Sequence, residues 1–183
     1  MPWKPLSLGL TVLIVLMSGA NAQSDQNLGE CIADVARSDF SAKKAFQVGL
    51  HDLIVREKPK FAELADLNMR LQIALAQSRR MRIGHLLQTD LERLDTKHGM
   101  SRFTNFDWSA ADTSALIQAN ARFEALTSEI TGLKSRNNGH SDWPALRKFF
   151  AGELAQNPGY KVLLSAFQDA RKLSGQRLLK CRA

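Results

Sequence analysis

The chain has 183 residues, of which 44% are hydrophobic and 23% charged, and its formal net charge is +7. A chain of this size suits one domain with a core of its own. The sequence contains no Gly-rich phosphate loop, no dinucleotide-binding fingerprint and no Gly-x-Ser-x-Gly elbow, so these classes of nucleotide-binding protein and hydrolase are not indicated.

The first 22 residues have the pattern of a secretion signal. One positive charge, Lys4, precedes a mainly apolar core over residues 6–17, and the small residues of Ala20-Asn21-Ala22 form an Ala-x-Ala cleavage site. The core is shorter than the roughly 20 apolar residues of a membrane-spanning helix, although an uncleaved anchor is the alternative. We therefore expect a cleavable signal over residues 1–22 and a single periplasmic or secreted domain over 23–183, with no stable membrane span.

The only two cysteines, Cys31 and Cys181, lie near the two ends of this expected domain. In an oxidising compartment such a pair normally forms a disulfide, and the alternative is two separate buried thiols. We predict the bridge.

Apolar residues recur at three- and four-residue steps along the chain, which predicts an all-α protein. Long helices are expected over residues 28–56, 59–98, 109–138 and 158–181, with a loop over 99–108 and a short helix over 141–157 that crosses one end of the bundle. Ser109 with Asp112 predicts a capping box, and helix stops are predicted at residues 137–139 and at Asn157-Pro158. The predicted fold is an antiparallel helical bundle of four long helices plus one short helix, with the termini joined by the disulfide. In an antiparallel bundle with an even number of long helices, the first helix starts and the last helix finishes at the same end of the bundle. This places Cys31 and Cys181 together, as a bridge requires.

Two expected helices contain irregularities. Asp39 interrupts the apolar side of the first, which predicts a break near residues 38–41. The forty residues of the second would span about 60 Å, so that helix either extends beyond its neighbours or breaks, most plausibly near Gly84. The aromatic residues of the loop that follows are expected to pack on it; the alternative is a ligand-binding patch. They are Phe103, Phe106 and Trp108.

The second helix also carries the candidate binding site. An apolar stripe of leucines at 64, 67, 71 and 75 becomes polar when continued at the same spacing, and the densest basic cluster of the chain lies at this switch. Arginine suits an anion-binding face because its planar fork matches carboxylate and phosphate. We predict a partner- or anion-binding face; the alternative is a solvated helix face. Its residues are Arg79, Arg80, Arg82 and His85.

No metal, cofactor or catalytic group is indicated by spacing. The four histidines are scattered, and the pair Asp95 and His98 supplies only two ligands where a structural zinc site needs four. Capping of a helix end is the better explanation of His98. We expect no metal or cofactor, and an enzyme is not favoured.

The basic excess of the chain is concentrated at its C-terminal end. Residues 159–183 carry six lysines and arginines against the single acid Asp169, while the rest of the expected domain is close to neutral. Such a helix can attract an acidic protein or an anionic envelope component, although the helix dipole and solubility also explain the charges. Nucleic acid is not an expected partner of an exported protein.

These observations favour an exported, non-catalytic helical protein that binds another macromolecule, as an adaptor, chaperone, inhibitor or envelope-assembly factor. One alternative is a carrier of a small molecule or metal that uses the polar stripe of the second helix. Another is a hydrolase-like enzyme whose site is assembled by the fold.

Overall fold

The structure is a computed structural model that describes the backbone of residues 19–181 and the side chains of residues 27–181. The predicted signal falls mainly on residues 1–18, which lie outside the described residues. Within the described part the chain is helical and contains no strand. Its α-helices are α1 (Gly19–Glu57), α2 (Ala62–Thr89), α3 (Gly99–Thr104), α4 (Ala110–Ala119), α5 (Ala121–Asn138), α6 (Trp143–Phe149) and α7 (Pro158–Lys180). Short 3-10 turns at Pro59–Phe61 and Leu91–Arg93 and a π-helical turn, η3, at Phe150–Leu154 complete the fold.

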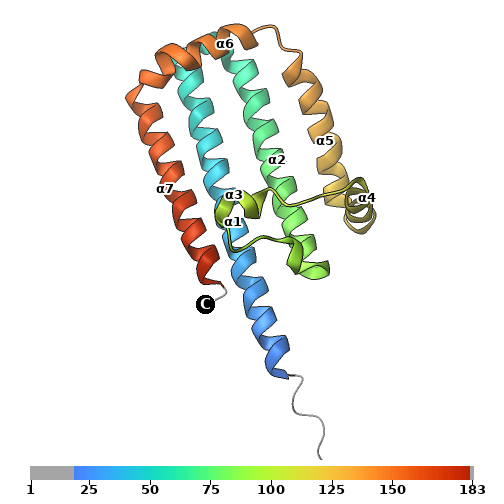
Figure 1. The fold of residues 1–183 in the computed structure, drawn as a ribbon. Helices are drawn as coiled ribbons and strands as arrows, with labels where there is room; N and C mark the ends of the chain where they lie inside the picture. The colour runs from blue at the N-terminus through green and yellow to red at the C-terminus, as the bar shows by residue number, and fades with distance from the viewer. Residues whose placement is uncertain (1–18, 182–183) are drawn as a thin grey trace, which may run out of the picture.

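Four helices stand side by side as a row in the order α7, α1, α2, α5, and their directions alternate (Figure 1). Extensive contacts join α7 to α1, α1 to α2, and α2 to α5. Helix α6 crosses one end of the row, as expected of the short helix, and α3 lies against α1 and α2 towards the other end (Figure 1). The all-helical class is therefore confirmed, but α5 and α7 stand at opposite ends of a row rather than side by side in a closed ring.

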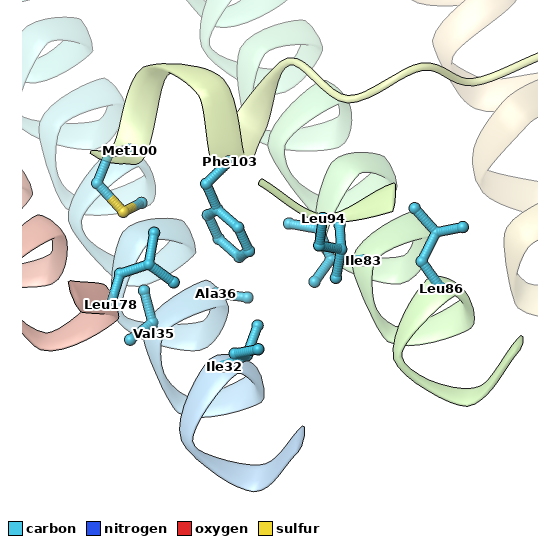
Figure 2. Packing of buried hydrophobic residues seen from close by; sticks show 9 residues of the cluster. All are labelled: Ile32, Val35, Ala36, Ile83, Leu86, Leu94, Met100, Phe103 and Leu178. Carbon is cyan, nitrogen blue, oxygen red and sulfur yellow. The ribbon is translucent and has the colours of Figure 1, made fainter. Parts of the chain in front are cut away.

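Two hydrophobic clusters lie at different heights along α1. In the first, α3 inserts the fully buried Phe103 between Ile32 of α1 and Ile83 of α2, and Leu178 of α7 joins them (Figure 2). Phe106 and Trp108 pack against the same cluster, so the packing role predicted for these aromatic residues is confirmed.

The second cluster lies under α6 and η3, where Leu146, Phe149 and Leu154 pack on Leu50 and Leu53 of α1. A third cluster joins α2 to α5. Between the first two clusters, residues 37–49 of α1 contribute no buried residue to either of them, and Phe46 packs against the second from outside. This middle section of α1 positions the candidate site.

The disulfide between Cys31 and Cys181 is present, with Cα atoms 5.7 Å apart. It ties the end of α7 to α1, so both cysteines lie at one end of the row, as the even number of long helices predicts. Closer to the other end, Gly49 lets α1 approach α7, since a Cβ atom there would come within 2.8 Å of Leu163.

Helix α2 is shorter than the sequence predicts. It ends at Thr89 rather than near residue 98, and Gly84 does not interrupt it. Asp90 takes an extended backbone conformation with φ of −163°, and the chain turns through Leu91–Arg93 towards α3. The apolar residue Leu94 therefore keeps its burial in the first cluster without being helical. The expected loop over 99–108 contains α3, which begins at Gly99 with φ of +78°, a conformation that favours glycine.

The expected helix over 109–138 is divided into α4 and α5. Ser109 and Asp112 form the predicted capping box of α4. Asn120 then adopts an extended conformation, and its side chain caps α5 by accepting a hydrogen bond from the backbone NH of Phe123. Because this N-cap within the apolar seam ends one helix and begins another, the prediction of a single long helix is wrong.

The break predicted at Asp39 is also wrong, because α1 is continuous from Gly19 to Glu57. Asp39 is 5% exposed and faces inward. Its charge is neutralised by basic groups on α1 and α7, so the helix does not need to break to bring this carboxylate to water. The stops predicted at residues 137–139 and at Asn157-Pro158 are confirmed, and Asn157 caps α7 through the backbone NH of Gly159 and Tyr160.

Candidate functional site

A cavity of about 300 Å³ opens on the middle section of α1, between the cluster under α3 and the cluster under α6. Three helices form its walls. Its lining residues are Lys43, Phe46 and Gln47 of α1, Gln72, Leu75, Ala76, Ser78, Arg79 and Arg82 of α2, and Phe167 of α7. Ser78 and Arg82, the first two residues of the polar continuation of the leucine stripe on α2, thus line this cavity.

Three cationic side chains line the cavity, and its described lining contains no acid. Lys43, Arg79 and Arg82 are each only partly exposed, so bulk water compensates their charges incompletely. The nearest carboxylate contact lies one helical turn away, where Asp39 accepts a hydrogen bond from Nζ of Lys43 at 2.5 Å. The same carboxylate also faces Nε of Arg171 at 3.6 Å. One anion is therefore shared by two cations, and Arg79 and Arg82 add two more positive charges at the cavity.

The burial of these groups alters how they titrate. The pKa of Lys43 is lowered below 10.5, chiefly because burial disfavours the ammonium form. Asp39 opposes this shift by stabilising the ammonium, while the positive charges of Arg79 and Arg171 add to it. The pKa of Arg82 is likewise lowered, by burial first and then by repulsion from Arg79. A bound anion would relieve the repulsion at each of these groups.

Two buried polar atoms at the cavity lack a hydrogen-bond partner among the described residues. One is the hydroxyl oxygen of Ser78, whose side chain belongs to a residue only 3% exposed, and the other is Nε of Arg82. An unsatisfied buried polar group costs about 1–3 kcal/mol.

Aromatic rings hold the basic groups in place. The guanidinium of Arg82 lies 5.3 Å from the ring centroid of Trp108 and 5.9 Å from that of Phe123, within the range of a cation–π contact. On the opposite wall, Phe46 and Phe167 stack with their centroids 4.8 Å apart. These contacts join a cationic wall on α2 to an apolar wall made by α1 and α7.

The four residues predicted from the basic cluster do not all face the same space. Arg79 and Arg82 line the cavity. Arg80 points to the other side of α2, where it lies over Phe40 at 5.0 Å and borders a separate groove with Arg37. His85 packs edge-on against Trp108, 5.9 Å away, and does not line the cavity. All four predicted residues are partly buried.

Other residues of the site were not predicted. Lys43, Phe46 and Phe167 come from helices that the basic cluster does not mark, and only the fold brings them to α2. The sequence contained a signal for Asp39, because an acid within an apolar stripe needs a basic partner. One of its two partners, Arg171, lies on α7, and the sequence does not show that α7 packs beside it. Among the described residues of the predicted basic C-terminal stretch, only Arg171 has this inward role; Lys161, Lys172, Arg177 and Lys180 are exposed.

Asp95 and His98 pair in the turn before α3, with Nδ1 of His98 2.8 Å from the Asp95 carboxylate. His98 stands at the N-terminal boundary of α3, and its side chain does not cap that helix, so the capping role predicted for it is wrong. Within residues 27–181, no cluster of three or more histidine, cysteine, aspartate or glutamate side chains is arranged to hold a metal ion.

None of the helices in the described part of the chain is long and apolar enough to cross a membrane. No protein-family model matches the chain, and comparisons with curated proteins and with solved structures find no significant similarity.

Proposed function

We propose that this chain is an exported, non-catalytic binding protein, and that its cavity takes up an anionic group of another envelope component. The observation that carries the proposal is the charge at the cavity. Lys43, Arg79 and Arg82 line it, and the adjacent Asp39 is already shared with Arg171. Arg79 and Arg82 are partly withdrawn from water and have no carboxylate partner among the described residues, so part of the desolvation that a bound anion requires has already occurred in the folded protein.

A small-molecule carrier is the second candidate, and the position of the cavity favours it. Ser78 and Arg82 of the polar stripe line a partly open pocket between three helices rather than a flat surface. About 300 Å³ is the lower end of the range of small-molecule sites. A metal carrier or a hydrolase has less support, since the described lining residues include neither a ligand cluster nor a carboxylate pair.

Export rests on the sequence pattern of residues 1–22, and the disulfide between Cys31 and Cys181 is compatible with an oxidising compartment. Expression of the full sequence in a bacterium and mass spectrometry of the periplasmic fraction tests it. We expect a protein that begins at Gln23 and contains no free thiol. An uncleaved protein found only in the cytoplasm would contradict export.

Anion binding is tested by thermal unfolding at constant ionic strength, with chloride replaced stepwise by citrate. Ligands that bind only the native state raise its melting temperature by mass action. Because citrate-like anions also stabilise proteins non-specifically, we compare two variants with the same change of charge, Arg79→Gln and Arg80→Gln.

Wild type and Arg80→Gln should show the same citrate-dependent rise in melting temperature. Arg79→Gln should lose most of this rise because, of the two substituted arginines, only Arg79 lines the cavity. Equal rises in all three proteins would contradict the proposed site. A pull-down from periplasmic extract with the same pair of variants then shows whether the anionic group belongs to a macromolecule.

A further inference from the structure

The cavity has two chemically different walls. Arg79, Arg82 and Ser78 of α2 form a cationic, hydrogen-bonding wall, to which Lys43 of α1 contributes its ammonium group. Across from it, the stacked rings of Phe46 and Phe167 form an apolar wall, and Leu75 extends it on the α2 side. A ligand that matches both walls has a charged end and an apolar end.

The size of the cavity separates this ligand from a simple ion. A water molecule accounts for roughly 30 Å³ of liquid, so about 300 Å³ is space for a molecule of several such units. Inorganic phosphate at the cationic wall would leave the two phenyl rings facing water. An organic body in that space would instead remove apolar surface from water, at roughly 25 cal/mol per Å².

The cationic wall is suited to an oxyanion. Arginine binds planar carboxylate and tetrahedral phosphate with two parallel hydrogen bonds. Ser78 also lines this wall, but its hydroxyl oxygen is buried from solvent without a hydrogen-bond partner, so it is not an exposed donor. Nε of Arg82 is also without a partner, and it is held near the cavity by the rings of Trp108 and Phe123.

We propose that the ligand is a small organic oxyanion, a carboxylate or phosphate monoester, whose apolar body lies against Phe46 and Phe167. This inference rests on the second candidate function, the small-molecule carrier, and specifies the class of its ligand. The charged end contacts Arg79 and Lys43, and the apolar end occupies the part of the cavity between α1 and α7.

Isothermal titration with four probes tests the inference on the full, exported protein. Acetate and inorganic phosphate carry only the anionic group, and 3-phenylpropionate and phenyl phosphate add one aromatic ring. We expect each ring-bearing probe to bind at least about tenfold more tightly than its simple counterpart, because the ring buries apolar surface. Whichever ring-bearing probe binds more tightly identifies the head group as carboxylate or phosphate.

Two variants locate the contacts. Phe167→Ala should reduce the advantage of the ring-bearing probes and leave the affinity for acetate and phosphate unchanged. Leu173→Ala, on the same helix and 59% exposed, is the matched control and should alter neither. Arg79→Gln should weaken all four probes. If Phe167→Ala proves unstable, the comparison among probes in the wild-type protein still decides the inference.

The outcomes separate this inference from the proposed function. If all four probes bind equally well, the apolar body makes no contribution and the inference is overturned, while anion binding stands. If none of the four binds, both are overturned. Tighter binding of the ring-bearing probes that Phe167→Ala does not reduce would also contradict the inference, because the ring would then lie elsewhere.

Discussion

Arg79 and Arg80 are consecutive residues of α2, yet they face different spaces. Arg79 lines the cavity between α1, α2 and α7, whereas Arg80 lies over the ring of Phe40 and borders a groove on another side of the helix. Successive residues of an α-helix are about 100° apart around its axis, so a run of basic residues cannot act as one surface. The pair provides a matched test of where an anion binds.

Asp39→Asn should lower stability and raise anion affinity at the same time. The change leaves Lys43 and Arg171 without their shared counter-ion in a buried setting, at a cost of about 3–5 kcal/mol in the free energy of unfolding. It also removes a negative charge beside the cavity, so citrate should bind roughly tenfold more tightly. Urea unfolding and titration calorimetry measure the two effects. Asp52→Asn, at an exposed position of α1, is the control; weaker anion binding in Asp39→Asn would contradict this assignment.

The affinity for anions should fall as the pH rises towards 10. The pKa of Lys43 is lowered below 10.5 by burial, so its ammonium loses its proton at a lower pH than an exposed lysine does. The surrounding charged groups are Asp39, which favours the ammonium, and Arg79 and Arg171, which oppose it. Calorimetry between pH 7 and 10 should show a decline in wild type that is absent in Lys43→Gln. A decline of equal size in the variant would mean that another group is responsible.

The contact between Arg93 and Asp112 should make stability sensitive to acid. Two hydrogen bonds from the Arg93 guanidinium, together with the Ser109 backbone NH and hydroxyl, hold the pKa of Asp112 far below its ordinary value of 3.8. A carboxyl whose pKa is lowered by folding contributes stability that is present above about pH 4 and is lost as the pH falls towards its folded pKa. Asp112→Asn should therefore show a shallower loss of stability between pH 4 and 2, measured by urea unfolding. Asp169→Asn, an exposed acid on α7, should keep the wild-type slope; a flattened slope in both variants would contradict this role.

The disulfide between Cys31 and Cys181 closes a loop with a sequence separation of 150 residues. Removing such a bridge from a small secreted domain typically costs about 2–5 kcal/mol. Urea unfolding of the double variant Cys31→Ala/Cys181→Ala should show a loss in that range. Two titratable thiols in denaturant, with no change of gel mobility on reduction, would contradict the bridge itself.

The sequence predicted those parts of the fold that depend on local signals. The capping box at Ser109 and Asp112, the stop at residues 137–139 and the start of α7 at Pro158 are set by side chains that act on the adjacent backbone. The disulfide was predicted from the expected oxidising compartment and from the even number of long helices. The end of α2 at Thr89 was missed because the apolar period continues through Leu94, a residue that packs under α3 without being helical.

The sequence predicted only those site residues that lie on one helix, α2. The change from leucines to polar residues along α2 marked Arg79 and Arg82, and both line the cavity. Lys43 and Phe167 were missed because their role depends on how α1 and α7 pack beside α2. Asp39 was misread as a helix break although Lys43, four residues along the same helix, pairs with it; its second partner, Arg171, is brought to it only by the packing of α7.

The position of the bound anion tests the central claim most directly. Side-chain Nε–Hε resonances of arginines can be followed by ¹H–¹⁵N NMR while the protein is titrated with citrate at constant ionic strength. The account predicts that the resonances of Arg79 and Arg82 shift and saturate together, because both guanidinium groups face the cavity, while that of Arg80 stays in place. Equal, non-saturating shifts of all three resonances, or a saturating shift at Arg80 alone, would contradict it.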